Sequence, residues 1–409
     1  LALLKWGLAN ANKDLNLLSE ERAAAIAHSA MEIYEGNHLA QFPLDIFQTG
    51  SGTSTNMNMN EVISSLSSTE VDTVHPNDHV NMGQSSNDVI PSAINVDSSL
   101  TVVNQLLPSM THLKNSIDEK AKSIGDIPKN GRTHLMDAMP VTFAQEMSAW
   151  SAQINDAMEQ YQVLLTKLQQ LAIGGTAVGT GVNADPNLAK QCCIHMNKLT
   201  GMEFRPANNS FQAISSQDAS LMLSSCNRTL AVALTKISND LRWMNSGPLG
   251  GLGEITLPAL QPGSSIMPGK VNPVIPESVC MVASQVLGND LTITHAAQSG
   301  NFQLNVMLPL IAHNLSESLS LLSSACMSLA DKAIKDFEVN QENIQSMLNK
   351  NPILATALNA TIGYETGAQI VKKAYNEKRS IIDVASEMTD LDSDTLSQIL
   401  DPVKLTRNQ

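Results

Sequence analysis

Along residues 143–168 an apolar residue recurs every three or four positions, and this spacing limits the chain to a narrow set of folds. The stripe consists of Phe143, Met147, Trp150, Ile154, Met158, Tyr161, Leu165 and Leu168. Steps of three and four place these side chains on one face of an α-helix. A helix of about 30 residues is ~45 Å long, which exceeds the usual helix of a globular protein. The spacing therefore predicts a long helix with one face buried in a helical bundle.

Two further segments predict helices of similar length. One stripe consists of Leu230, Leu234, Ile237, Leu241 and Met244. Another helix is expected from about Leu308 to Ile334, where Pro309 is tolerated because it lies in the first turn. Aromatic residues make up only 3% of the chain and Met is frequent, which suits the packing of helices better than sheet. We expect a mainly α chain with a long central helical bundle, and we interpret the stripes as core.

The order of long and short elements predicts three domains. We expect an N-terminal domain at residues 1–84, a central bundle at 85–341 and a small C-terminal helical domain at 342–409. Because the chain starts inside an expected helix, we expect the first domain to be truncated at its start. Two Gly-rich connectors, 174–181 and 247–253, are predicted to be tight turns, since they lack the Gly-Lys-Ser/Thr of a phosphate loop and the strand that precedes a dinucleotide site.

Composition excludes several classes of partner and indicates a compartment. The net charge is −14 without a basic run, which opposes nonspecific binding to nucleic acid or to anionic membranes. The five cysteines form no CxxC pair, so neither a disulfide framework nor a zinc spacing is indicated. No run approaches the ~20 apolar residues of a membrane span. We expect a cytoplasmic protein, or one of the mitochondrial matrix if a targeting segment is missing.

A polar segment at residues 49–61 indicates anion binding. Glycines and hydroxyl residues, among them Ser51, Gly52 and Thr53, come just before an expected helix. Backbone N–H groups and hydroxyls at a helix N-terminus can bind a carboxylate without a net charge. The alternative is an ordinary helix cap, although the density of polar groups exceeds what a cap requires.

A second polar segment spans residues 75–88. His75 and His79 are four residues apart, but Pro76 interrupts the regular helix on which a two-histidine zinc motif depends. We therefore interpret this segment as a polar binding loop. At its end, Ser85, Ser86 and Asn87 either cap the next helix or present donors to a ligand.

Two more segments carry candidate acid–base groups. Thr133 and His134 lie in a loop that leads into the long helix at residue 143. The loop at residues 263–279 combines hydroxyls, a cation, an amide and a carboxylate: Ser264, Ser265, Lys270, Asn272 and Glu277. Such a loop suits acid–base chemistry on an anion, in which Glu277 could orient a histidine. Taken alone, it is equally compatible with a plain connection between helices.

Together these segments resemble a known family. The phrases GSGTSTNMNMNEV, HPNDHVNMGQSSND, GRTHLMDAMPVT and GSSIMPGKVNP are similar to those of the fumarase/aspartase superfamily, and specifically of class II fumarate hydratases. The resemblance covers nearly the whole chain in order. Relative to the family, several tens of residues are absent at the N-terminus and the segment 63–75 is short.

The resemblance implies an activity and an assembly. It implies reversible hydration of fumarate to malate through an aci-carboxylate intermediate, as in the tricarboxylic acid cycle, with no metal or organic cofactor. Ser264 would be the base, and His134 with Glu277 would manage the proton of the departing hydroxyl. The resemblance also implies a homotetramer in which segments of three subunits form each active site.

The same resemblance implies how substrate is held. Lys270 and Asn272 would stabilise the charge of the intermediate, with Thr133 and Ser265 close by. The carboxylate-binding positions of the family correspond to Ser51, Gly52, Thr53, Ser85, Ser86 and Asn87. A second dicarboxylate site corresponds to His75, Pro76, Asn77 and Asp78.

Three alternatives remain. Aspartate ammonia lyase shares two of these segments, but it usually carries Gln in place of His134, Asn in place of His75 and Ala in place of Gly269. Argininosuccinate and adenylosuccinate lyases lack the Asn-Met-Asn segment. A catalytically inactive helical scaffold of the same fold is disfavoured because the working residues are all present.

Overall fold

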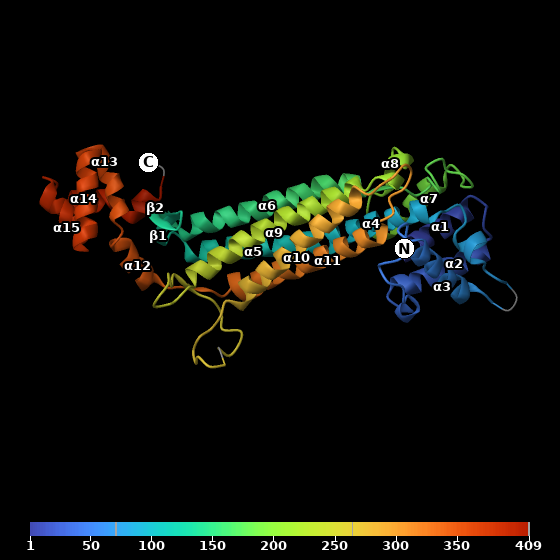
Figure 1. The fold of residues 1–409 in the computed structure, drawn as a ribbon, viewed down its shortest axis with the longest axis horizontal. Coiled ribbons are helices and arrows are strands. Elements are labelled where there is room, and N and C mark those ends of the chain that lie inside the picture. Colours follow the sequence, from blue (N-terminus) through green and yellow to red (C-terminus); the bar gives the residue numbers. More distant parts are fainter. Residues whose placement is uncertain (70–71, 264, 408–409) are drawn as a thin grey trace. The chain divides into compact units, whose positions relative to one another are not determined.

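The computed structural model describes residues 1–69, 72–263 and 265–407, which divide into two compact units (Figure 1). The first unit comprises Leu1–Pro108, Ala157–Val232 and Val282–Ser324. The second comprises Ser109–Asp156, Ala233–Met281 and Ala325–Gln409. The predicted boundaries after residues 84 and 341 are not tested by this division and stay predictions.

Long helices confirm the mainly α fold. They are α5 (Leu107–Ile124), α6 (Phe143–Leu168), α9 (Asp218–Met244), α10 (Val274–Ala297) and α11 (Leu308–Leu329), which the turn η4 (Ala330–Ile334) extends. Helices α6, α9, α10 and α11 each contribute to both units. Pro309 lies in the first turn of α11, as expected. The helices form the predicted bundle, since hydrogen bonds join α6 to α9 and α9 to α10.

The buried face of α6 differs in detail from the predicted stripe. Ala157 and Leu164 are buried, whereas Met158 and Leu165 are only half-buried. A strict alternation of four- and three-residue steps from residue 143 reaches positions 157 and 164, and this keeps one seam along the helix. The predicted stripe of α9 is confirmed, because all five of its members are buried.

The rest of the first unit consists of shorter elements around two apolar cores. These elements are α1 (Ala2–Asp14), α2 (Glu20–Tyr34), η1 (Leu39–Gln41), α3 (Thr53–Ser67), η2 (Pro76–Val80), α4 (Ser86–Thr101), η3 (Val102–Leu106), β3 (Gln170–Leu171), α7 (Leu188–Thr200), β4 (Arg205–Pro206) and α8 (Ser210–Ser215). One core lies between α1, α4 and α7, and the other between α1, α2 and α3. Helix α1 therefore belongs to both cores.

Among its described residues, the second unit has two antiparallel strand pairings and a helical C-terminal part with its own core. Its strands are β1 (Pro128–Thr133) and β2 (Met136–Thr142), which form a hairpin, and β5 (Ile255–Thr256) and β6 (Glu338–Val339), which pair with each other. Its short helices are α12 (Gln341–Asn349), η5 (Pro352–Leu358), α13 (Asn359–Ile362), α14 (Tyr364–Glu377), α15 (Ile381–Met388), α16 (Ser393–Ile399) and α17 (Pro402–Leu405). The hairpin occupies a segment for which only a loop was predicted.

Candidate active site

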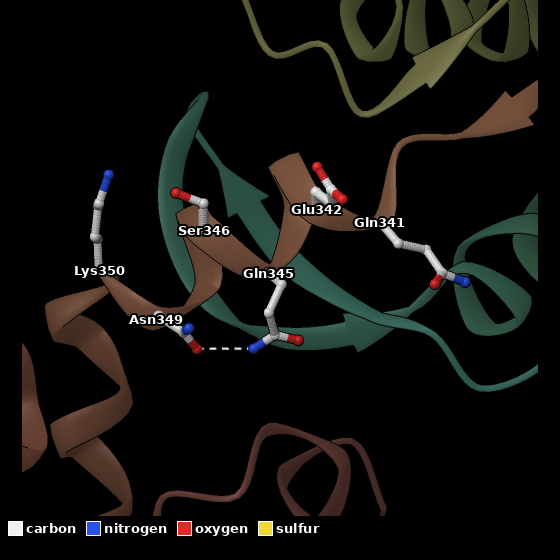
Figure 2. Close-up of a pocket in the computed structure, with 6 residues that line it drawn as sticks. All are labelled: Gln341, Glu342, Gln345, Ser346, Asn349 and Lys350. Atoms are coloured by element: carbon white, nitrogen blue, oxygen red, sulfur yellow. Dashed lines mark hydrogen bonds between the residues drawn. The ribbon is translucent and has the colours of Figure 1, made fainter.

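One hollow of the surface does not coincide with the predicted site residues. A hollow of about 640 Å³ lies on α12 and is lined by Gln341, Glu342, Gln345, Ser346, Asn349 and Lys350 (Figure 2). Its residues come from α12 and from Lys350 at its C-cap, and a hydrogen bond between Gln345 and Asn349 spans one turn of the helix. None of the predicted site residues lines this hollow.

The start of α3 presents uncharged donors. Ser51 is buried, and its hydroxyl lies 2.8 Å from the hydroxyl of the exposed Thr53. Gly52 caps the helix with a φ of 72°, a conformation that favours glycine, and the side chain of Gln48 accepts a hydrogen bond from the N–H of Thr55 in the first turn. The first N–H groups of α3 and these hydroxyls therefore provide donors of the kind that bind a carboxylate.

The start of α4 combines a cap with donors. Ser85 and Asp88 form a capping box, so the predicted cap is confirmed at Ser85. Asn87 donates a 2.8 Å hydrogen bond to the carbonyl of Ala177. Asn56 of α3 donates a 3.1 Å hydrogen bond to the hydroxyl of Ser86. This bond joins the starts of α3 and α4 into one polar surface.

Asp88 anchors this surface to the Gly-rich connector. Its Oδ2 accepts hydrogen bonds from the N–H groups of Gly174 (3.0 Å) and Thr176 (2.9 Å), and its Oδ1 accepts one from Ser85 (2.9 Å). Burial raises the pKa of Asp88 to about 6, while these backbone hydrogen bonds oppose the rise. The connector is thus a tight turn with a defined role, since it holds the segment that carries Asn87.

A buried cation lies behind the same surface. Lys5 of α1 is fully buried and donates hydrogen bonds to Asn81 (3.0 Å) and Gln84 (2.7 Å). Asn81 in turn accepts a hydrogen bond from Asn56. Sequence reasoning missed Lys5; the available signal was a cation within an apolar helix face at Leu3, Leu4 and Leu8.

The residues of the expected second dicarboxylate site lie around η2. The Nδ1 atom of His75 accepts hydrogen bonds from the N–H groups of Asn77 (3.3 Å) and Asp78 (3.1 Å), and Pro76 occupies the first position of the turn. The backbone N–H of His75 donates to Nδ1 of His79 over 2.8 Å. Burial, followed by the nearby Arg22, lowers the pKa of His79. His75 therefore caps a short turn, and its assignment to a ligand site stays a prediction.

In the second unit, Thr133 and His134 lie at the tip of the β1–β2 hairpin. Thr133 pairs with Met136, so His134 and Leu135 form the two-residue turn. Both have positive φ angles, 56° and 61°, as the turns favoured in hairpins require. The tip residues are exposed. His134 is thus presented to the surroundings on a short strand pair, not on the loop that was predicted.

The loop before α10 brings two of its predicted residues together. Lys270 donates a 2.6 Å hydrogen bond to the side-chain oxygen of Asn272, and both residues are exposed. Gly263 lies so close to the backbone of Lys270 that a Cβ there would come within 2.6 Å of the Lys270 carbonyl oxygen. Ser265 is exposed beside this closure. Ser264 lies outside the described residues.

Glu277 lies in the first turn of α10 and is half-buried. Among the described residues, the ion pairs of this single chain do not include one between Glu277 and His134. The structure therefore places the predicted site residues in separate groups: the starts of α3 and α4 and the turn η2 in the first unit, and the hairpin tip and the 263–277 segment in the second.

Comparison with known proteins identifies this arrangement. Residues 1–288 match the lyase family, and residues 354–407 match the fumarase C C-terminus. The class II fumarate hydratase of Xylella fastidiosa is 54% identical over 407 residues, which are 99% of this chain and 86% of that protein. A second relative, fumarate hydratase class II 2 of Pseudomonas aeruginosa, is also 54% identical, over 99% of this chain and 89% of that protein.

A solved structure agrees with these matches. The class II fumarase of Schistosoma mansoni superposes with a TM-score of 0.96 at 40% identity, covering 99% of this chain and 89% of that one. The long helices and their polar segments thus define a lyase with the fumarase/aspartase fold. The chain belongs to the class II fumarate hydratase family. None of the helices within the described residues is long and apolar enough to cross a membrane.

Proposed function

We propose that this enzyme catalyses the reversible hydration of fumarate to malate. One observation of the structure carries the proposal: the Asn56–Ser86 hydrogen bond joins two helix N-termini into a surface of uncharged donors. Such a surface suits a dicarboxylate because N–H dipoles and hydroxyls bind carboxylate oxygens without neutralising them. The relatives named above are fumarate hydratases, and an ammonia lyase is not favoured.

The chemistry requires removal of a weakly acidic proton beside a carboxylate. In the malate direction we assign this step to Ser264, which takes the proton from C3 and leaves the electron pair in an aci-carboxylate. Lys270, Asn272 and nearby hydroxyls would stabilise the added negative charge. The hydrogen bond between Lys270 and Asn272 supports this assignment, because it holds both groups in one orientation.

Loss of the hydroxyl completes the reaction. The C2–O bond breaks, the electron pair of the aci-carboxylate forms the double bond, and the hydroxyl leaves as water after it gains a proton. We assign delivery of this proton to His134, oriented by Glu277. Thr133 and Ser265 would hold the substrate, together with Ser51, Gly52, Thr53, Ser85, Ser86 and Asn87. We assign the segment from His75 to Asp78 to a second dicarboxylate site.

We further propose a homotetramer whose active sites are shared between subunits. Within the described part of one chain, His134 and Glu277 form no ion pair with each other, so a second copy is the natural source of the partner. Large apolar side chains are also exposed on the long helices, as expected of faces that cover one another. They include Val163, Val232, Trp243, Met281 and Leu291. Sedimentation of the purified protein tests this proposal, and a monomer active with malate would contradict it.

We place the enzyme in the cytoplasm or, where a targeting segment precedes the chain, in the mitochondrial matrix. All five cysteines are free thiols, and Cys192, Cys193 and Cys326 are buried. Burial raises the pKa of Cys326 to about 12, so its reactive thiolate is suppressed. Free, unreactive thiols suit a reducing compartment.

A direct test follows the ultraviolet absorbance of fumarate when the purified protein is mixed with malate or, separately, with aspartate. Fumarate from malate alone supports the proposal. Fumarate from aspartate alone would assign the chain to the ammonia lyases instead. Absence of fumarate with both substrates would favour an inactive scaffold.

A further inference from the structure

We infer that Glu254 is a positioning residue for His134, because its carboxylate fixes the hairpin that carries Thr133 and His134. The role of His134 rests on the function proposed above. The inference itself rests on a cluster of four charged residues in the second unit, of which Lys129 and Glu254 are buried and Arg132 and Glu146 are partly exposed.

The cluster begins with two cations on β1. In a regular strand, residues three apart point to opposite faces. Here the register shifts between Asn130 and Arg132, so that two residues of β2 lie opposite Gly131. A Cβ at Gly131 would lie 2.4 Å from the carbonyl oxygen of Met139, which makes glycine necessary at this irregularity. Lys129 and Arg132 nevertheless both reach the same carboxylate.

That carboxylate belongs to Glu254, whose backbone is fixed on both sides. Its N–H donates to the carbonyl of Met244 over 2.8 Å, and its carbonyl accepts from the N–H of Asn340 over 2.9 Å. One carboxylate oxygen lies 2.7 Å from the Arg132 guanidinium, and the other lies 2.8 Å from the Lys129 ammonium. The Glu254 side chain is only 2% exposed. The pairs are therefore shielded from solvent.

Lys129 is equally enclosed. Its ammonium also lies 2.6 Å from Glu146 and 4.8 Å from the centre of the Phe143 ring. Two cations and two carboxylates balance in charge, which burial of this depth demands. Loss of the Glu254 charge would leave two partly or fully buried cations with a single carboxylate.

The cluster lies next to the hairpin tip, so we expect it to determine the position of His134. Arg132 directly precedes Thr133, so its guanidinium fixes the strand at the last residue before the exposed tip. On another side of the hairpin, Asn351 donates hydrogen bonds to the side chain of Asn130 (3.0 Å) and to the carbonyl of Ala138 (2.9 Å). The turn residues His134 and Leu135 are exposed, so the base of the hairpin determines where the imidazole is held. A displacement of about 1 Å can cost roughly 100-fold in rate.

The test replaces Glu254 by Gln, which keeps the shape and removes the charge. We expect kcat with malate to fall by about 10- to 100-fold while KM changes less than about threefold, because substrate is held mainly by the first unit. Asp290→Asn is the matched control. Asp290 is also a buried carboxylate, and it pairs at 2.7 Å with Arg228, in α9 and not in the hairpin. We expect Asp290→Asn to lower the thermal midpoint but to have a kcat within about threefold of that of the wild type.

A conservative variant separates position from stability. Glu254→Asp keeps the charge and shortens the side chain, so kcat is expected between those of the wild type and Glu254→Gln. Arg132→Lys tests the same contact from the other side if Glu254→Gln fails to fold. Equal losses of kcat in Glu254→Gln and Asp290→Asn would overturn the inference, because they would reflect general destabilisation.

Hydrogen exchange provides a readout that does not depend on activity. We expect the amides of residues 128–142 to exchange about tenfold faster in Glu254→Gln than in the wild type or in Asp290→Asn. Unchanged exchange in this segment would overturn the inference. A wild-type protein without activity on malate would instead count against the proposed function alone.

Discussion

Lys5 donates a 2.7 Å hydrogen bond to the side-chain oxygen of Gln84 although no part of Lys5 is exposed. Burial lowers the pKa of Lys5 to about 7, and the charge of Asp88 opposes this effect only partly. In the unfolded chain the pKa returns to its ordinary value near 10.5. Between these two values the unfolded state binds more protons, so the free energy of unfolding rises with pH.

Replacing Lys5 by Met is expected to remove this rise. Titration of one such group changes the free energy of unfolding by at most about 1.4 kcal/mol per pH unit. The measurement is the thermal midpoint at pH 7, 8 and 9 for the wild type, for Lys5→Met and for Lys190→Met, where the lysine is exposed. Parallel curves for the wild type and Lys5→Met would contradict the prediction.

Asp88→Asn is expected to weaken substrate binding more than catalysis. Asp88 accepts hydrogen bonds from Gly174, Thr176 and Ser85, whereas an amide has only one oxygen to accept them. Hydrogen bonds to charged groups contribute about 1.5–3 kcal/mol each. We expect KM for malate to rise about tenfold because the segment that carries Asn87 loosens. Steady-state kinetics check this, and a fall in kcat at constant KM would argue against the assigned binding role.

The sequence predicts the long helices well because burial repeats along them with the helical period. It predicts individual positions less well. Met158 and Leu165 were expected in the buried stripe, but the buried residues are their neighbours Ala157 and Leu164, which are also apolar. The hairpin was not predicted, because Gly131 and Pro140 interrupt any alternation of apolar and polar residues. Its strands depend on pairing with each other and on Glu254, which is far away in the sequence.

The candidate site, too, could be predicted only in part from the sequence. Its polar segments could be found from local composition, since hydroxyls and amides cluster next to glycine. Lys5 gives only a weak local signal, a cation within an apolar helix face, and its role depends on tertiary contacts with Asn81 and Gln84. The proposed pairing of His134 with Glu277 depends in turn on the proposed homotetramer, which a single chain does not reveal.

His134→Asn is expected to lower kcat with malate by about 100-fold or more, with a smaller change in KM, because general acid–base catalysis contributes about 10²–10⁴. Leu135→Asn is the control, since Leu135 shares the exposed turn and its positive φ, which Asn tolerates. Steady-state kinetics of both variants check the assignment. Equal losses in the two variants would indicate damage to the turn and not the loss of a catalytic group.

Ser264→Ala is expected to abolish nearly all turnover while sedimentation stays that of the wild type. The reason is chemical: without the hydroxyl, the position assigned to the base has no group that accepts a proton. Ser265→Ala is the control, because it changes the neighbouring hydroxyl, to which only substrate holding is assigned. Turnover like that of the wild type in Ser264→Ala would move the base to another residue.

Gly50→Ala is expected to raise KM for malate through the position of Ser51. A Cβ at Gly50 would lie 1.7 Å from the carbonyl oxygen of Val306, so the backbone has to move. The carbonyl of Gly50 also accepts a hydrogen bond from the N–H of Leu308, which ties the start of α3 to the start of α11. Such overpacking costs about 1–3 kcal/mol, and the displaced donors of α3 would bind carboxylate less well.

Gly250→Ala is the control, because a Cβ there meets nothing within 4 Å. Kinetics and thermal midpoints of both variants check the prediction, and a Gly50→Ala enzyme with unchanged KM would show that the start of α3 does not hold the substrate.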